Sequence, residues 1–291
     1  MNNRTNVARR KSSLLDCFGC CFGDDTVDND LTPLTRGHAR DEPGDGLRGR
    51  INATLNQSLG MDLARSQQAR RSLYATLGHM HDFTIEDTGV RLAKWPVQTH
   101  PRFRLVHRAT SKTIVLVTDG LSDPFDDMDA ADANVNGFGL ELYVETPVSD
   151  ISLDVTEIKS SWQYKLLSTV SNLAVSHGGI RQIIDSLGVL STEADGVAES
   201  IDPDVNRAFV SSDNRVGALL GLSDDRPAAA IPSFISDMPL STVKLVNVKL
   251  IQLTELAVIV NRGAEGRAHL ANLFSGDKEK TVSSLRRDPV I

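Results

Sequence analysis

Apolar and polar residues alternate along Phe138–Glu145, and this alternation predicts a β-strand with one face turned toward a core. The apolar positions share that face: Phe138, Leu140, Leu142 and Val144. The opposite face carries Glu141, Tyr143 and Glu145. Pro147 follows, and we expect the strand to end there because proline cannot donate a ladder hydrogen bond.

Three further apolar runs predict buried strands. Ile114–Thr118 is rich in β-branched residues, which favour the pleated geometry of a sheet. Val216–Ser223 and Thr242–Thr254 have the same character, and the apolar positions of the second run are expected to be half to fully buried.

Helical spacing of apolar residues appears in the stretches between the strands. It runs from Leu55 to Met80 and again through Ser160–Gly179, where the spacing that begins at Trp162 predicts an amphipathic helix. The paired glycines at the end of that stretch are typical helix terminators. Residues 178–191 are ambiguous and fit a further helical turn or a loop.

The last apolar stretch, Leu253–Phe274, predicts helical segments that are broken at Gly263 and Gly266. Strands and helices therefore intermix without a regular β-α-β alternation. This order favours an α+β fold, with a mixed β-sheet packed against helices, over a doubly wound fold.

The composition divides the chain into two regions. Residues 1–50 mix Arg, Asp, Asn, Gly, Pro and Thr with few periodic apolar positions, which predicts a disordered N-terminal extension. Residues 51–291 are then expected to form the folded domain. The 291-residue chain is 40% hydrophobic, has no apolar run of transmembrane length and no secretory signal, so we expect a cytoplasmic protein.

The three cysteines, Cys17, Cys20 and Cys21, lie together in the N-terminal extension. A structural zinc site needs four ligands, and no second cysteine pair is present in the sequence. We expect no membrane association unless one of these cysteines is acylated, which the preceding basic residues would favour. The net charge of -7 and the lack of a Lys/Arg cluster argue against a nucleic-acid partner.

Two short motifs suggest metal binding. Asp132, Asn134, Asn136 and Gly137 match positions 1, 3, 5 and 6 of a calcium-binding EF-hand loop, but position 12, which should be Glu, is Tyr143. We therefore predict no specific calcium binding. The "GHMHD" stretch contains His79 and His81, which at i, i+2 do not share a helix face; with no third ligand near, we interpret them as surface histidines.

Catalytic signatures are absent from the sequence. No G-x-S-x-G, P-loop or dinucleotide fingerprint occurs, so we expect no catalytic residues and no cofactor. Asp119 and Glu141 are carboxylates near strand ends, and we interpret them as solvated loop acids. The alternative is a metal-dependent enzyme that uses the acidic loop 119–137.

The order of motifs resembles the Suppressor of fused family over Ser66–Ile291. The segments that carry the resemblance are "VTDGLSD", "GFGLELYVETP", the Trp-led helix "SSWQYKLLSTVSNLAV", "VGALLGL", the long stretch from "VKLVNVKLIQLTEL" to "LANLF", and "VSSLRRDPVI". Where the family often has Trp-Pro, this chain has Trp162-Gln163. Residues 191–204 look like an acidic insertion.

The resemblance implies a non-catalytic module that binds a protein partner. Family members in animals restrain a transcription factor through a peptide added as a β-strand, and bacterial members are associated with immunity to toxins. Animal members have an additional C-terminal domain, so we expect the bacterial-type role of an immunity protein that sequesters a toxin domain. A signalling regulator that sequesters a transcription factor is the alternative.

The predicted strand Phe138–Glu145 supplies candidate partner-binding residues. Tyr143 lies between Glu141 and Glu145, and an aromatic residue flanked by acids is a plausible anchor for a basic partner. The alternative is that a helix covers this face or that it is merely solvated.

Overall fold

Nine strands form one mixed β-sheet within the residues that the computed structural model describes, namely 45–87, 95–96, 100–125, 135–223, 230–276 and 280–291. The strands run in the order β1-β3-β4-β5-β9-β7-β6, with β2 paired to β3 and β8 paired to β9. Their bounds are β1 His79–Met80, β2 Ile85–Glu86, β3 Arg102–Arg108, β4 Thr113–Thr118, β5 Leu140–Pro147, β6 Leu190–Ala194, β7 Val216–Leu220, β8 Phe234–Ile235 and β9 Val243–Ile251. Strands β5 and β9 are parallel, and the other paired strands are antiparallel.

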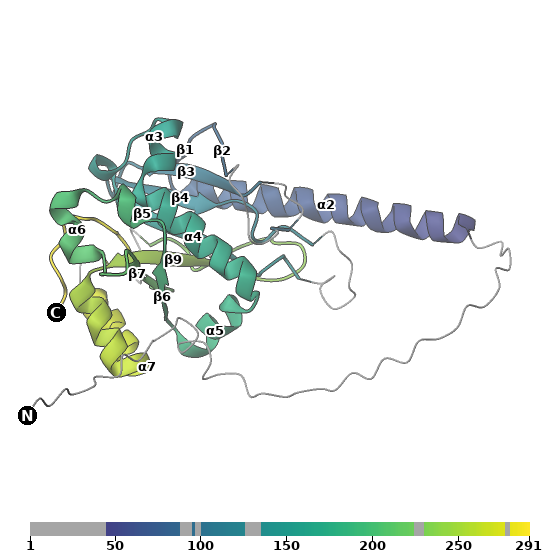
Figure 1. The fold of residues 1–291 in the computed structure, drawn as a ribbon. Coiled ribbons are helices and arrows are strands. Elements are labelled where there is room, and N and C mark those ends of the chain that lie inside the picture. The colour runs from purple at the N-terminus through teal and green to yellow at the C-terminus, as the bar shows by residue number, and fades with distance from the viewer. Residues whose placement is uncertain (1–44, 88–94, 97–99, 126–134, 224–229, 277–279) are drawn as a thin grey trace, which may run out of the picture. The chain divides into compact units, whose positions relative to one another are not determined.

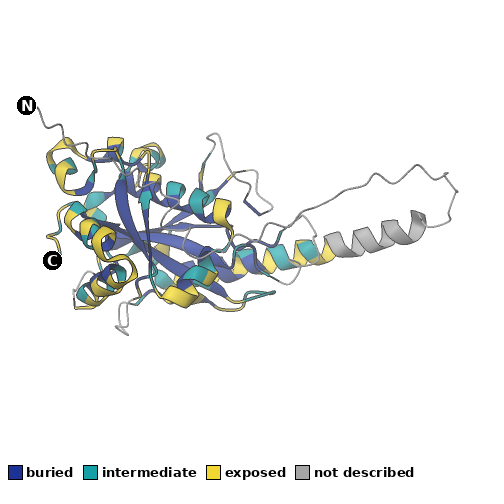
Figure 2. Ribbon diagram, turned by 60° about the horizontal axis from the view of Figure 1, so that its bottom comes forward, coloured by how far each residue is buried: buried dark blue, intermediate teal, exposed yellow. Residues whose placement is uncertain are grey.

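The middle of the sheet is buried on both faces. All six residues of β4 are buried, and so are all residues of β9 except Lys244. A strand that is covered on both sides has an almost continuous apolar sequence instead of an alternating one. Figure 2 shows this as dark blue strands surrounded by helices whose outer turns are exposed.

Six α-helices pack on this sheet in the described part of the chain (Figure 1). Their bounds are α2 Asp45–Leu77, α3 Val155–Ser160, α4 Trp162–His177, α5 Ile180–Leu187, α6 Pro203–Phe209 and α7 Leu253–Ser275. Helix α4 begins at Ser161, whose hydroxyl accepts a hydrogen bond from Tyr164 N, and it ends at Gly178, which has a positive φ.

Helices α2 and α4 cover opposite faces of the sheet. Neighbouring residues of β3 show this, because successive side chains on a strand point to opposite faces. The Phe103 ring packs against Tyr164 of α4, with ring centroids 5.2 Å apart. The next residue, Arg104, points the other way and pairs with Asp119, which is also bonded to Arg70 of α2.

Helix α7 consists of two arms joined at Gly263. That residue has φ 57° and ψ -127°, a conformation outside the helical region that glycine adopts without strain. The arms then pack tightly, since a Cβ atom at Gly266 would lie 2.5 Å from the carbonyl oxygen of Val258. Of the two predicted breaks in the closing helical segment, the one at Gly263 is confirmed and the one at Gly266 is wrong, because the chain is helical at Gly266.

Several sequence predictions are confirmed by the structure. The predicted strand at 114–118 is β4, those at 216–223 and 242–254 are β7 and β9, and the Trp-led helix is α4. The α+β class with a mixed sheet is confirmed as well. Strands β1, β2, β3 and β8 were not predicted.

The prediction for residues 178–204 needs correction. The first part of this segment forms the regular helix α5. Strand β6 follows and pairs antiparallel with β7 at the end of the sheet order. The supposed acidic insertion therefore supplies most of a sheet strand, together with a short 3-10 helix and the start of α6. Polar residues such as Ser191 and Thr192 conceal this strand in the sequence, although both are buried.

The chain divides into two units, Met1–Gly49 and Arg50–Ile291; the sheet, helices α3 to α7 and α2 from Arg50 onward belong to the second. Residues 1–44 of the predicted extension, with all three cysteines, lie outside the described residues, so the extension stays a prediction. None of the helices in the described ranges is long and apolar enough to cross a membrane.

Candidate partner-binding site

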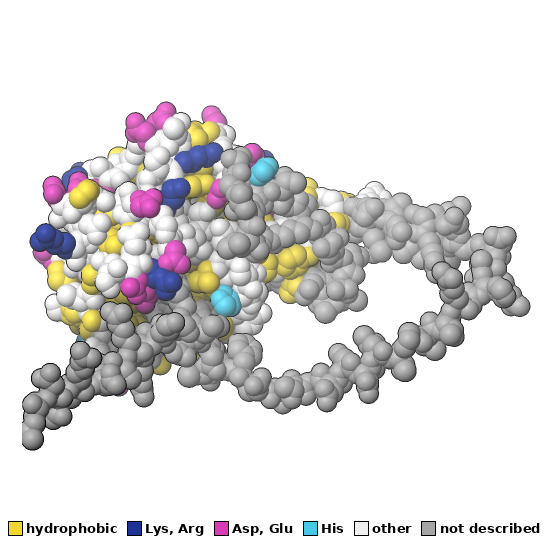
Figure 3. All heavy atoms as spheres, viewed as in Figure 1, with side chains coloured by type: hydrophobic (Ala, Val, Ile, Leu, Met, Phe, Trp, Pro, Cys, Tyr) yellow, Lys and Arg dark blue, Asp and Glu magenta, His cyan; other side chains and the backbone are white. Residues whose placement is uncertain are grey.

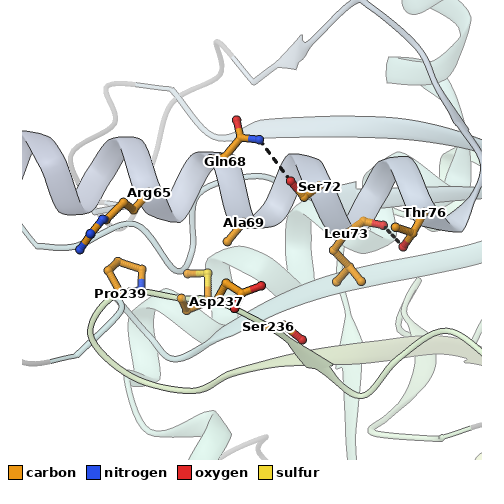
Figure 4. A pocket seen from close by; sticks show the side chains of 10 residues that line it. Arg65, Gln68, Ala69, Ser72, Leu73, Thr76, Ser236, Asp237 and Pro239 are labelled. Atoms are coloured by element: carbon orange, nitrogen blue, oxygen red, sulfur yellow. Dashed lines mark hydrogen bonds between the residues drawn. The ribbon is translucent and has the colours of Figure 1, made fainter.

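A groove with a volume of about 640 Å³ lies between α2 and the loop that follows β8 (Figure 4). One wall is formed by successive turns of α2 and the other by the loop. The α2 residues are Arg65, Gln68, Ala69, Ser72, Leu73 and Thr76, and the loop residues are Ser236, Asp237, Met238 and Pro239. We call this hollow the α2 groove.

The α2 groove has an apolar base and a polar rim. Ala69 and the partly buried Leu73 and Met238 belong to, or pack against, the hydrophobic cluster between α2 and the sheet. The rim carries exposed polar side chains, including Arg65 and Asp237. A few polar groups around an apolar base are typical of sites that bind a peptide or another small ligand.

The strand next to the groove has an unpaired edge. Among the described residues, β8 is hydrogen-bonded to β9 and has no strand on its other edge. Phe234 of β8 is 47% exposed, with Lys244 Nζ 6.0 Å from its ring centroid. An extended peptide can add to such an edge through main-chain hydrogen bonds.

Beneath the groove, a buried cluster of charged side chains holds α2 on the sheet. Arg70 of α2 is fully buried and donates to Asp119 Oδ1 at 2.8 Å, to Ser122 Oγ at 3.1 Å and to Asp123 Oδ1 at 2.5 Å. Its Nε also lies 3.6 Å from Glu141 Oε1. We call this the Arg70 cluster; its members are Arg70, Arg102, Arg104, Asp119, Asp123 and Glu141.

The charges of the Arg70 cluster are balanced, with three guanidinium groups facing three carboxylates. Arg104 Nε lies 3.0 Å from Asp119 Oδ2, and Arg102 lies 3.5 Å from Asp123 Oδ2. Glu141 accepts hydrogen bonds from the backbone N–H groups of Gly120 and Ser122 and from two hydroxyls. Buried charges are tolerated when they are paired and hydrogen-bonded in this way.

The pKa values follow from this pairing. Burial opposes the Arg70 cation, but the attraction of Glu141, Asp123 and Asp119 raises its pKa above the ordinary value. Burial also opposes the charged form of Asp119, yet Arg70 and Arg104 hold its pKa below the ordinary value. For Glu141, burial is the larger effect and raises the pKa, against the opposing influence of Arg70 and the hydroxyl donors.

Asn136 ties three parts of this region together. Its Nδ2 donates to Ser66 Oγ of α2 at 2.7 Å and to the carbonyl oxygen of Ser122, and its Oδ1 accepts from the backbone N–H groups of Leu240 and Ser241. The side chain is fully buried, so its oxygen is already used inside the protein. This residue therefore organises the loops around α2, and these hydrogen bonds account for its place in the apparent calcium motif.

The three residues predicted to contact a partner do not lie on an exposed face. Glu141 is fully buried in the Arg70 cluster, and Tyr143, 2% exposed, lies in the hydrophobic cluster under α2. Glu145, also 2% exposed, accepts from Arg108, Thr113 and Thr281. The expectation of an exposed face is therefore wrong, and the alternative that a helix covers this face is confirmed, because α2 and the C-terminal segment lie on that side of β5.

The remaining candidates from the sequence are the loop acids and the proposed metal ligands. Asp119 and Glu141 were interpreted as solvated acids, whereas both are buried and bonded to partners on other elements. Asp132 and Asn134 lie outside the described residues. In the rotamers of the structure, no three His, Cys, Asp or Glu side chains of the described ranges are placed to hold a metal ion.

Sequence reasoning missed Arg70 and the α2 groove. A usable signal exists for the first: Ser66, Arg70 and Tyr74 are four residues apart and share a helix face with apolar neighbours. A polar stripe on an otherwise apolar face indicates buried hydrogen bonding. The groove depends on how a loop far along the chain approaches α2, and local pattern carries no such information.

No model of a known protein family matches this chain, and no curated protein matches its sequence.

Proposed function

We propose that this protein is a non-catalytic binding module that sequesters a protein partner. The observation that carries the proposal is the α2 groove beside the unpaired edge of β8. In this proposal an extended segment of the partner pairs with β8 and places side chains against Ala69, Leu73 and Met238. Main-chain pairing supplies affinity in such complexes, and the flanking pockets supply specificity.

The Arg70 cluster supports a binding role because it fixes one wall of the groove. A docking wall that is already ordered loses less entropy on binding than a mobile one. The titratable groups of this cluster with shifted pKa values, Arg70, Asp119 and Glu141, are bonded to each other below the surface and are not turned toward the groove. Their arrangement favours a structural use of these charges over a catalytic one.

The resemblance to the Suppressor of fused family suggests the kind of partner. Peptide addition as a β-strand is the mode known for that family, and its bacterial members are associated with toxin immunity. We therefore propose a cytoplasmic, antitoxin-like role. The net charge of -7 favours a basic partner, since opposite charge speeds the encounter. Lys/Arg and Asp/Glu side chains are interspersed on the face shown in Figure 3.

Co-expression with the product of the adjacent gene tests this proposal, with the dissociation constant of the purified complex as the measurement. The variant Ser72→Trp places a large ring in the groove from an exposed position of α2. We expect at least ~10-fold weaker binding, which corresponds to about 1.4 kcal/mol.

The matched control is Ala75→Trp, an equally exposed position on the same helix that does not line the groove. It should leave the affinity unchanged. Equal loss in both variants would remove the groove from the proposal. A metal-dependent turnover of substrate by the purified protein alone would refute the non-catalytic assignment itself.

A further inference from the structure

Three histidines come together at one edge of the sheet, where the sequence suggested only isolated surface residues. His79 begins β1, and its partner in the antiparallel ladder with β3 is His107. Directly opposite residues of such a ladder point to the same face, with Cβ atoms about 4.5–5.5 Å apart. His81 follows two residues after His79, and its backbone N–H donates to the carbonyl oxygen of Leu105 on β3.

The strand conformation changes the meaning of the i, i+2 spacing. On a helix such residues diverge, but on extended backbone they share a face. The imidazole rings confirm the shared face, since the centroids of His79 and His81 are 5.2 Å apart. Gly78 permits this approach: a Cβ atom there would lie 2.3 Å from the carbonyl oxygen of His107.

One imidazole nitrogen in this group lacks a partner. The Nε2 of His81 is shielded from solvent and has no hydrogen bond within the described part of the chain. An imidazole nitrogen without a hydrogen-bond partner can serve as a ligand for a metal ion.

We propose that His79, His81 and His107 form a binding site for a divalent transition-metal ion such as Zn²⁺, with a fourth position open to water. Three imidazoles are an established ligand set for zinc. In the present rotamers the three nitrogens do not converge on one point. The proposed site therefore requires side-chain rotations of His79, which is exposed, and His107, which is half-buried.

The site would fasten the short strand β1 to β3. Strand β1 has only two residues, and it leads directly out of α2. A metal ion bridging His79 and His107 would therefore hold the end of α2 against the sheet edge. This role does not depend on the proposed partner binding, because the α2 groove is lined by other residues.

Calorimetric titration of the full chain with ZnCl₂ at neutral pH tests the site. Cysteine thiols also bind zinc, so every protein in the test carries Cys17→Ser, Cys20→Ser and Cys21→Ser. We expect one ion per chain. His107→Ala should weaken binding by at least ~10-fold, because even the loss of an outer partner of a metal ligand has an effect of this size.

The control is His269→Ala, which removes an exposed histidine of α7. It should leave the zinc affinity unchanged. Binding of Co²⁺ gives a second readout, since four-coordinate cobalt absorbs visible light strongly and the His107→Ala protein should lose this band while keeping its circular dichroism spectrum. No stoichiometric binding, or equal affinity of the His107→Ala and His269→Ala proteins, would overturn the proposal.

Discussion

Replacing Arg70 by methionine tests whether the Arg70 cluster holds α2 on the sheet. Methionine retains much of the length of arginine but removes its charge and all its donors. The variant leaves Asp119 with Arg104, and leaves Asp123 with the more distant Arg102. Glu141 keeps its hydroxyl and backbone donors but loses its nearest cation.

The expected loss of stability follows from burial. Arg70 is fully buried, and Asp123 and Glu141 are too, so water cannot replace the missing guanidinium. Breaking a buried ion pair by removing one partner costs about 3–5 kcal/mol. The free energy of unfolding of a domain is only about 5–15 kcal/mol. At about 2–4 °C per kcal/mol, the melting temperature should fall by roughly 6–20 °C.

Urea unfolding followed by tryptophan fluorescence measures this loss, because the two tryptophans, Trp95 and Trp162, are both buried. The control is Arg71→Met, the exposed neighbour on the same helix, which should change stability by no more than about 0.5 kcal/mol. A loss below about 1 kcal/mol for Arg70→Met, with an unchanged denaturant slope, would refute the reasoning.

Three other changes test separate parts of the structure. Asp119→Asn should destabilise the protein at pH 7, because folding lowers the pKa of Asp119. The loss of stability relative to the wild-type protein should be full above about pH 5 and should shrink as the pH falls through about 4. Urea unfolding midpoints at several pH values measure this loss. Ser283→Ala removes the acceptor of the buried Leu250 N–H, 3.0 Å away, and should cost about 1–3 kcal/mol in urea unfolding. Gly266→Ala should cost a similar amount in the same assay, because its Cβ atom would overlap the Val258 carbonyl oxygen.

The serine and glycine changes each have a matched control. Ser275→Ala, at an exposed serine of α7, should alter stability by no more than about 0.5 kcal/mol. Gly60→Ala, at a helical glycine with no atom near the added Cβ, should leave stability unchanged or raise it by up to about 1 kcal/mol. A pH-independent effect of Asp119→Asn, or an equal effect of a change and its control, would contradict the corresponding contact.

The strands that sequence reasoning found are those whose burial is nearly uniform. Strands β4 and β9 are covered on both faces, so their side chains are mostly apolar, and polar side chains such as Thr118 and Lys249 are hydrogen-bonded inside the protein. Helix α4 has a serine at its start and a glycine at its end. In these elements the local sequence preference matches the tertiary environment, and such elements can be predicted from sequence pattern.

Strand β3, which sequence reasoning missed, consists largely of polar residues with tertiary partners. It contains three arginines and a histidine in seven residues, and its arginines pair with carboxylates on β5 and on the loop after β4. The alternation in β5 was real, but it separates an apolar face from a buried polar face. A polar side chain requires hydrogen-bond partners, and a partner on another element meets this requirement as well as water does.

The same reasoning explains why sequence pattern placed Glu141, Tyr143 and Glu145 on an exposed binding face. Charged and aromatic residues on a strand normally face solvent or a partner. Here Glu141 contacts Arg70 and Tyr143 packs in the cluster around Tyr74, both on α2, whereas Glu145 is bonded to β3, β4 and the C-terminal segment. One face of α2 makes those buried contacts, and the neighbouring face lies toward the loop after β8. The groove forms between this second face and the loop. The misread residues therefore position the candidate site from below, although they do not line it.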